Sequence, residues 1–201
     1  MPGRNRVNPF SEIVSIPGRG LLMGNRGCLH VDGQIRHHHN GRRWIICTTE
    51  YRGRRLEQWA EGRYTVLFFH DEAVALAAGH RPCARCMPDR FHAFVDGWRA
   101  AFGEKASAND IDARLHQERV LGDAQRTTLA PWDSLPSGAF AVIDSVPVLV
   151  LDEVISRWTI DGYSRPTPRQ TSGMAEILTP PATLDVLRAG YSPIVAPIPT
   201  T

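Results

Sequence analysis

The sequence contains no long hydrophobic run. No stretch approaches the roughly 18 apolar residues that a membrane-spanning helix needs, and the opening Met1-Pro2-Gly3-Arg4 is not followed by the apolar segment of a secretory signal. These absences exclude a membrane-spanning helix from the expected structure. We therefore expect a cytoplasmic protein.

Lysine and cysteine are both scarce. Lys105 is the only lysine, so arginine supplies 22 of the 23 basic residues, and the 201 residues include four cysteines. A reducing compartment seldom lets four cysteines form two disulfides, and a hydrophobic share of 42% is sufficient for a packed core without them. A Cys-x-x-Cys pair in such a protein indicates metal binding or redox chemistry.

Several common functional motifs are also missing. The chain has no glycine loop of the phosphate-binding type, no Gly-x-Ser-x-Gly nucleophile elbow and no EF-hand calcium loop. These absences count against a P-loop nucleotide hydrolase, a serine hydrolase of the elbow type and an EF-hand protein.

Apolar patterning predicts an α+β fold. Helices are expected in three segments, each with apolar residues at helical spacing: 71–79, with Asp71 as its cap and Gly79 as its stop, Pro88–Phe102 and Asn109–Leu121. Short strands are expected where apolar residues alternate or cluster: 44–47, 64–69, 139–143, 146–151, 154–159 and 174–178. The half of the chain beyond Leu135 should therefore be rich in β structure.

We expect three regions along the chain. Residues 13–103 form a zinc-binding module, residues 104–193 form a helix followed by a β-rich region, and residues 194–201 form a proline-rich tail that is frayed. Ala78-Gly79-His80-Arg81-Pro82 and Ala189-Gly190-Tyr191-Ser192-Pro193 each end an apolar helical pattern with glycine and then proline. We interpret this similarity as a shared way of ending a helix.

The Cys83-Ala84-Arg85-Cys86 segment is the strongest functional motif. Two thiolates on one tight turn can occupy two corners of a zinc tetrahedron. The pair precedes the helix expected from Pro88, and a helix N-terminus stabilises thiolate. A thioredoxin-like redox pair would instead follow a strand in a βαβ pattern, which this segment lacks.

The surroundings of this pair resemble a known zinc domain. The segment from Phe68 to Asp89 is similar to the second half of the metal-binding domain of the Ada family of methyl-phosphotriester DNA repair proteins, through the residues Phe68-Phe69, Ala73, Ala77-Ala78-Gly79-His80-Arg81-Pro82-Cys83, Cys86 and Pro88-Asp89. That family holds one zinc ion with four cysteines and uses one of them as a methyl acceptor. The resemblance implies that Cys83 and Cys86 are zinc ligands and that Cys47 occupies the first ligand position. Tyr51 stands where the family has its remaining cysteine.

A closed tetrahedral site needs a further donor. Cys28 is the first candidate because a fourth thiolate suits a structural zinc site, and His30 is the substitute. Cys28 could equally be an ordinary buried hydrophobic residue. The run His37-His38-His39 lies beside the turn sequence Asn40-Gly41, and we interpret it as a solvated loop.

An enzymatic alternative uses other residues. Zinc deaminases carry His-x-Glu and Pro-Cys-x-x-Cys, and the chain contains both His116-Gln117-Glu118 and Pro82-Cys83-Ala84-Arg85-Cys86. His116 would be the third ligand and Glu118 the general acid/base. Because the two strings occur in reverse order, Asp112 and His116 on a solvated helix face remain the simpler interpretation.

Positive charge is concentrated in the N-terminal third. The formal net charge is +2, yet residues 1–63 carry eleven arginines against five acids. Aromatic residues are interleaved with the arginines at 36, 42, 43, 52, 54, 55 and 63, a combination that suits phosphates and stacked bases. Arginines on the outer face of strands, or a bias from a GC-rich genome, would give the same pattern.

Three functions follow from these patterns. The leading one is a zinc-stabilised α+β protein that binds nucleic acid, with DNA as the expected partner, through Arg36, Arg42, Arg43, Arg52, Arg54 and Arg55. The second is a zinc-dependent hydrolase or deaminase-like enzyme. The third is a structural zinc protein with a protein partner. The ligand count separates them, because four protein ligands favour a structural site and three with water favour catalysis.

Overall fold

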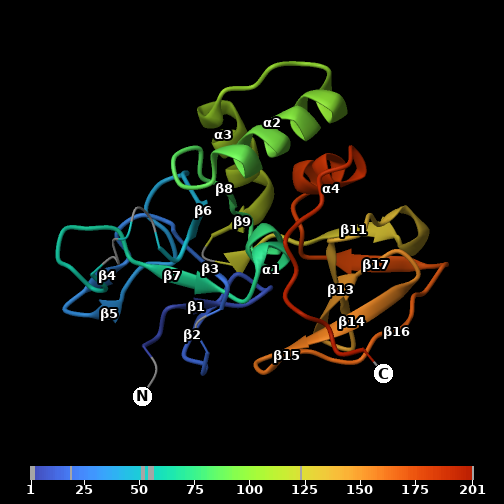
Figure 1. Cartoon of the computed structure of the whole chain (residues 1–201), viewed down its shortest axis with the longest axis horizontal. Helices are drawn as coiled ribbons and strands as arrows, with labels where there is room; N and C mark the ends of the chain where they lie inside the picture. The colour runs from blue at the N-terminus through green and yellow to red at the C-terminus, as the bar shows by residue number, and fades with distance from the viewer. Residues whose placement is uncertain (1–2, 19, 51–52, 54–56, 123, 201) are drawn as a thin grey trace.

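The described part of the chain folds into two large sheets and two small two-stranded ones, with helices packed beside and between the large sheets. The computed structural model describes residues 3–18, 20–50, 53, 57–122 and 124–200. Figure 1 shows the sheet of the N-terminal half on one side and the C-terminal sheet on the other, with α2 and α3 above them and α4 beside the C-terminal sheet. This architecture confirms the expected α+β class with a β-rich C-terminal half.

The first sheet is built from short strands that are far apart in the sequence. Within the described residues it has six strands, in the order β2-β1-β7-β3-β6-β8. Their bounds are β1 (Arg6–Val7), β2 (Ile13–Val14), β3 (Leu22–Asn25), β6 (Ile45–Thr48), β7 (Leu67–Phe69) and β8 (Arg81–Pro82). A separate hairpin joins β4 (His30–Val31) to β5 (Gln34–Ile35).

The second sheet is a meander with one long return. In the described part of the chain it has the order β11-β17-β12-β13-β14-β15, and β16 pairs with β14. The strands are β11 (Thr128–Pro131), β12 (Phe140–Ile143), β13 (Val146–Val150), β14 (Val154–Thr159), β15 (Gly162–Tyr163), β16 (Thr167–Pro168) and β17 (Met174–Ile177). A small ribbon of β9 (Val120–Leu121) and β10 (Ala124–Gln125) precedes it.

The helices lie close to the expected segments, except that the third ends at Arg119, because Val120–Leu121 pairs as β9. They are α1 (Glu72–Ala77), α2 (Pro88–Phe102), α3 (Ala108–Arg119) and α4 (Pro181–Arg188), with a short 3-10 turn at Trp132–Ser134. The side chain of Asp71 caps α1, and Gly79 just beyond its end has a φ of 81°. The expected helix over Pro88–Phe102 is confirmed at both ends.

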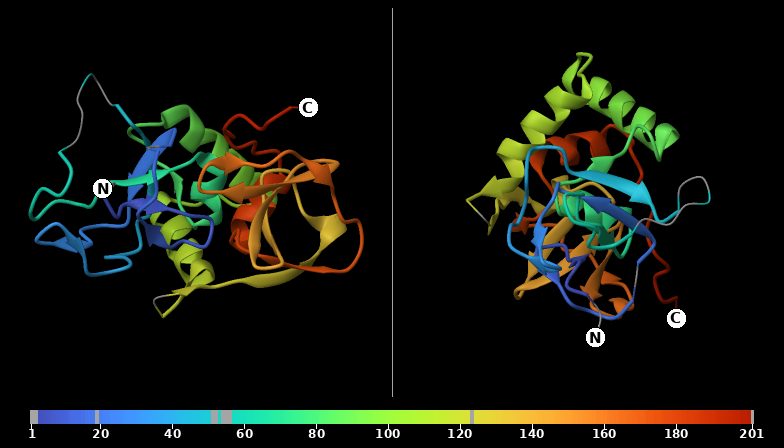
Figure 2. Two further views of the ribbon diagram at one scale, coloured as in Figure 1. Left: turned by 90° about the horizontal axis from the view of Figure 1, so that it is seen from below. Right: turned by 90° about the vertical axis from the view of Figure 1, so that its left-hand side faces the viewer.

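Helix α2 connects the two halves of the molecule. Phe94 and Trp98 on its inner face are buried, and the Phe94 ring lies 5.4 Å from the ring of Tyr191, which follows α4. The right-hand view of Figure 2 shows α2 and α3 as an inverted V above the rest of the chain. One hydrophobic cluster includes residues from both sheets and from these helices, so the core does not break at residue 103.

Contrary to expectation, the C-terminal tail is not frayed at Ile194 and Ala196. The backbone N–H of Ile194 donates to Glu72 Oε2 at 2.8 Å, and that of Ala196 donates to Asp71 Oδ2 at 2.9 Å. Ala196 is buried. Buried acceptors at the start of α1 therefore hold the tail, a long-range pairing that composition does not reveal.

The helices are too short or too polar to cross a bilayer. This holds for every helix in the described part of the chain.

Candidate metal centre

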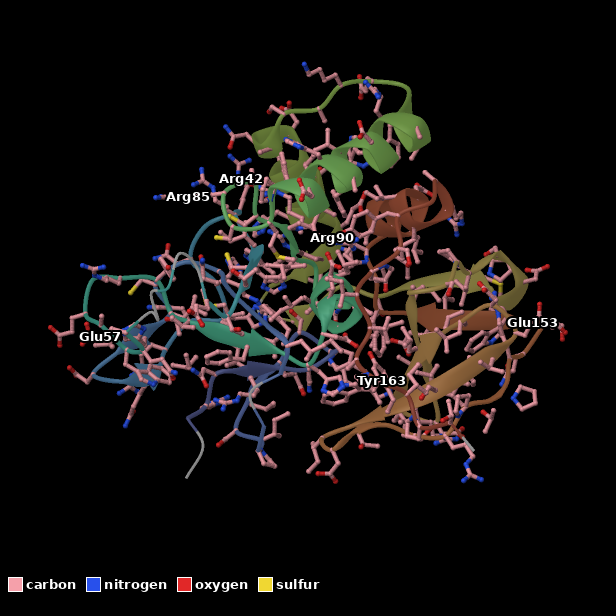
Figure 3. The ribbon with its side chains drawn as sticks, in the orientation of Figure 1. Arg42, Glu57, Arg85, Arg90, Glu153 and Tyr163 are labelled. Atoms are coloured by element: carbon pink, nitrogen blue, oxygen red, sulfur yellow. The ribbon has the colours of Figure 1, made fainter. Side chains whose placement is uncertain are left out.

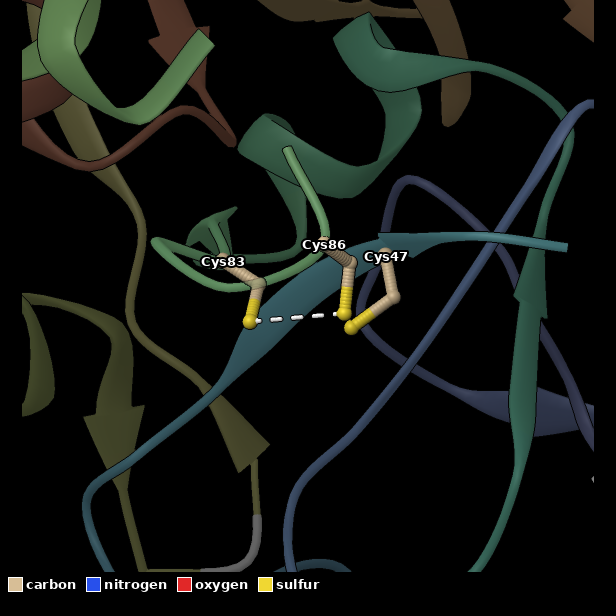
Figure 4. A group of neighbouring side chains, drawn as sticks. All are labelled: Cys47, Cys83 and Cys86. Carbon is tan, nitrogen blue, oxygen red and sulfur yellow. Dashed lines mark hydrogen bonds between the residues drawn. The ribbon is translucent and has the colours of Figure 1, made fainter. Parts of the chain in front are cut away.

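Three cysteines meet where the first sheet joins α2. Cys47 lies on β6, Cys83 directly follows β8, and Cys86 lies just before α2. The three sulfur atoms all lie within 4.8 Å of one another, and the Cys86 thiol donates to the Cys83 sulfur at 3.7 Å. Figure 4 shows the three side chains converging from the strand and the turn.

Backbone pairing places the thiols without help from a ligand. β6 and β8 run parallel, with Ile46 opposite Pro82. The N–H of Cys83 donates to the carbonyl of Ile46 at 2.9 Å, and the N–H of Met87 closes the turn onto the carbonyl of Cys83 at 2.9 Å. The strand thus sets Cys47 beside the turn that carries the other two cysteines.

The three cysteines differ in their exposure. Cys47 is 4% exposed and packs with Met23, Val66 and Phe68, whereas Cys83 and Cys86 are half-buried. Cys47 is therefore the deepest of the three residues. An ion held there would be reached from the side of Cys83 and Cys86.

The three thiols differ in their pKa values, so they do not ionise equally. The Cys47 thiol hydrogen-bonds to Cys83, and the backbone N–H groups of Cys86 and Arg85 add to this, so the pKa of Cys83 falls to about 5. The same hydrogen bond, together with burial, raises the pKa of Cys47. Burial raises the pKa of Cys86. A bound metal cation would displace the protons that the three thiols share, because cysteine binds metal as the thiolate.

This donor set is suited to a metal ion. Three sulfurs from two separate segments can occupy three corners of a tetrahedron, the geometry of soft-ligand metal sites. The expected grouping of Cys47, Cys83 and Cys86 is therefore present as a cluster that could hold an ion.

The structure does not bring Cys28 or His30 to this cluster. The Cys28 thiol faces the carbonyl oxygen of His30 at 3.8 Å. The Nδ1 atom of His30 lies 2.7 Å from the Thr65 hydroxyl, and its ring packs edge-on against Trp59 with the centroids 5.4 Å apart. The hairpin that begins at His30 is therefore held by Thr65 and Trp59. No other Cys, His, Asp or Glu among the described residues joins the three sulfurs.

The residues of the deaminase-like alternative also lie elsewhere. The ring of His116 is 5.1 Å from the ring of His39, centroid to centroid. Glu118 accepts hydrogen bonds from Arg114 on α3 and from the N–H of Ala182 at the start of α4. Neither residue belongs to the sulfur cluster in the described structure. The geometry does not assemble the ligand set that this alternative requires.

Contrary to expectation, Asp112 and two of the three adjacent histidines are not solvated. Asp112 is buried and forms a two-pronged ion pair with Arg81, with distances of 2.9 and 2.7 Å. His38 and His39 are half-buried, and their rings lie 5.5 and 5.6 Å from the Trp44 ring. His37 is exposed, which fits a solvated loop. Burial depends on what packs over a segment, which local polarity does not show.

The burial of two arginines was not predicted from the sequence. Arg26 and Arg119 are almost fully buried, and each guanidinium lies 4.1 Å from the Trp44 ring centroid. Burial lowers the pKa of both. No local signal separates these two arginines from the solvent-exposed ones, because their burial results from distant segments, as the bonds from Arg26 to Ser11 and from Arg119 to Gly79 show.

The arginines expected to bind nucleic acid fall into separate places. Arg52, Arg54 and Arg55 lie outside the described residues. Arg36 lines a hollow with Arg4 and His37. Arg42 and Arg43 are exposed and line a different hollow, of about 500 Å³, with the amide side chains of Asn25, Asn40 and Asn109. In the view of Figure 3, Arg42 and Arg85 lie on the same side of the molecule.

The chain was compared with protein-family models, with curated proteins and with solved structures. None of the three comparisons finds a match.

Proposed function

We propose that this chain is a zinc-binding protein in which Cys47, Cys83 and Cys86 hold one zinc ion. The convergence of three sulfurs within 4.8 Å of one another carries the proposal. Zinc is the ion that such thiolate sets most commonly bind, with zinc–sulfur distances near 2.3 Å. The local resemblance to the Ada zinc domain, which holds its zinc with cysteines, supports the same ion.

The fourth coordination position is left to water or to an external ligand, so by its ligand count the site is an open one, of the kind that favours catalysis over a closed structural site. Because Cys83 and Cys86 are half-buried and Cys47 is deep, such a ligand would approach from the side of the turn. The phenol of Tyr64 lies close enough for the sulfurs to influence it, since burial and the charges of the three cysteines raise its pKa. Arg85, between the two ligands of the turn, is exposed to solvent.

Zinc would add a tie between strand and helix. Cys47 belongs to the first sheet, whereas Cys86 lies two residues before the start of α2. A metal that binds the folded chain stabilises it by its binding free energy. We therefore expect purified protein to contain close to one zinc ion per chain.

Replacement of one ligand tests the zinc site. Cys83→Ser should abolish stoichiometric zinc binding, measured by elemental analysis, and lower the midpoint of thermal unfolding. Cys28→Ser is the matched control, because Cys28 is also half-buried but lies outside the cluster. Cobalt(II) in place of zinc should produce sulfur-to-metal charge-transfer absorption. Full zinc content in Cys83→Ser, or a metal-free wild type of unchanged stability, would contradict the proposal.

We further propose that the surface around Arg42 and Arg43 binds nucleic acid, with DNA as the expected partner. Two exposed arginines and three asparagines line one hollow there, and side chains of these types can donate to phosphate oxygens. The carboxylate of Asp112 in the same hollow already has an ion-pair partner in Arg81.

A salt-dependent binding assay tests this surface. The double variant Arg42→Ser with Arg43→Ser should bind duplex DNA more weakly, and the slope of log affinity against log salt should fall by about 2, because each lost phosphate contact removes about one released counterion. Arg126→Ser with Arg165→Ser removes the same charge from exposed positions of the C-terminal half and serves as the control. Equal binding by both double variants would refute the proposal.

A further inference from the structure

Cys83 and Cys86 form a pair within the cluster. Their sulfurs are 3.7 Å apart and belong to one turn, so a disulfide of about 2.05 Å requires only small side-chain rotations. Both residues are half-buried and can be approached from solvent. Arg85 between them is exposed.

Cys47 lies within 4.8 Å of both sulfurs but is more deeply buried than they are. It is 4% exposed, and β6 is paired on one side with β3, where Cys47 faces Met23, and on the other with β8. A peroxide must reach a sulfur to oxidise it, so oxidation follows exposure as well as thiolate character. The pair on the turn is the accessible one.

We propose that the cysteine cluster is a reversible redox switch, in which a peroxide converts Cys83 and Cys86 to a disulfide and releases the zinc ion. This inference rests on the proposed zinc site. It assigns to the site a second property, sensitivity to oxidants.

The reaction balances with the peroxide as the only oxidant. One thiolate attacks a peroxide oxygen, the O–O bond breaks, and hydroxide leaves, so that the sulfur becomes a sulfenic acid. The second thiolate attacks that sulfur, forms the S–S bond and expels a second hydroxide. Two protons convert the hydroxides to water. The two sulfurs lose two electrons, the peroxide gains them, and zinc keeps its oxidation state.

Loss of two thiolates leaves zinc with Cys47 as its remaining cysteine ligand. A single thiolate cannot complete a tetrahedral site, so the ion dissociates. The bonds from Cys83 N–H to Ile46 and from Met87 N–H to Cys83 involve backbone atoms alone and persist. A thiol reductant that cleaves the disulfide therefore returns both sulfurs to the positions from which they bind zinc.

Hydrogen peroxide, a chromophoric zinc chelator and peptide mass mapping test the switch. Zinc-loaded wild type should release its zinc at the rate at which a Cys83–Cys86 disulfide appears, while Cys47 and Cys28 remain thiols. Dithiothreitol followed by zinc should restore full metal content. Cys28→Ser should release zinc at the wild-type rate, and zinc-free wild type should form the same disulfide.

The outcomes separate this inference from the zinc proposal. Absence of zinc from the purified protein refutes the zinc site, whatever peroxide does to the thiols. Stoichiometric zinc that survives peroxide, zinc release without a Cys83–Cys86 disulfide, or a disulfide that includes Cys47 would overturn the switch while the zinc site stands.

Discussion

At the scale of single residues, the most unusual feature is positive charge buried around Trp44. Arg26 and Arg119 both lie over the indole ring, and cation–π attraction offsets part of the cost of burying them. Their N–H groups donate to backbone carbonyls, including Ser11 for Arg26 and Gly79 for Arg119. The pairing of charge with a ring and with carbonyls replaces the usual carboxylate partner.

His80 completes this buried group as a neutral imidazole. Arg26 Nε donates to Nε2 of His80 at 3.2 Å, so Nδ1 carries the proton and faces the carbonyl of Ala75 at 3.2 Å. A second proton, on Nε2, would place a positively charged imidazolium against the guanidinium of Arg26. Burial, and then the charge of Arg26, lower the pKa of His80 well below its usual value of 6.5.

This histidine should make the protein sensitive to acid. Below pH 6.5 the unfolded chain takes up a proton at His80 that the folded chain refuses, so the free energy of unfolding should fall as pH falls, by up to about 1.4 kcal/mol per pH unit. Urea denaturation at pH 7.5 and pH 5.5 measures the slope. His80→Gln should be less stable at pH 7.5 but less dependent on pH.

An exposed histidine provides the control for this measurement. His92 lies on the solvent side of α2. His92→Gln should keep the wild-type dependence on pH. If His80→Gln retains the same slope as well, the neutral histidine is not the cause.

At the scale of elements, the start of α1 holds three segments together through Asp71. Its Oδ1 accepts from the N–H of Val74 at 2.9 Å and caps the helix, while Oδ2 accepts from the hydroxyl of Tyr163 at 2.7 Å and from the N–H of Ala196 at 2.9 Å. The expected cap is confirmed, and the structure adds two partners from the C-terminal half. Burial raises the pKa of this carboxyl.

The two side-chain caps of the described helices, Asp71 and Ser107, should differ in their importance. Asp71→Ala should lower the free energy of unfolding by about 3 kcal/mol, because it removes a cap worth about 1 kcal/mol and leaves buried donors without an acceptor. Ser107 caps α3 and holds no other segment of the described chain, so Ser107→Ala should lower the free energy of unfolding by about 1 kcal/mol. Chemical denaturation compares them. Equal losses would mean that Asp71 acts only as a cap.

At the scale of the whole molecule, the C-terminal tail connects the two halves. Glu72 is fully buried and accepts from Arg90, from the hydroxyl of Tyr191 and from the N–H of Ile194. With the bond from Ala196 to Asp71, the tail runs along the start of α1. Residues after α4 thus satisfy carboxylates that the first half buries.

Truncation tests this role of the tail. A chain that ends at Pro193 should unfold at a clearly lower temperature than the full chain, by an amount that corresponds to about 3 kcal/mol, since two hydrogen bonds to buried carboxylates are lost. A chain that ends at Ile198 keeps both donors and is the matched control. Calorimetric melting of the three lengths measures the effect. Identical transitions would show that the tail is dispensable.

Much of the local structure was predictable from the sequence because its causes are local. Proline at the start of α2 and a glycine in the left-handed region after α1 act on their own turn, and the alternation in 154–159 reflects the faces of one strand. The Cys-x-x-Cys pair was predictable for the same reason. Its two sulfurs are brought together by a single turn.

The rest depended on contacts between distant segments. Cys47 reaches Cys83 because β6 and β8 pair in parallel, and Cys28 does not reach them because Leu29 and His30, which follow it, are held by Thr65. The burial of Asp112 and the anchoring of Ala196 have the same origin, each in a partner far along the chain. The sequence by itself determined which turns and helices form and offered candidate ligands. The tertiary structure decided which of those ligands meet, because strand pairing between distant segments is not encoded in the residues next to each cysteine.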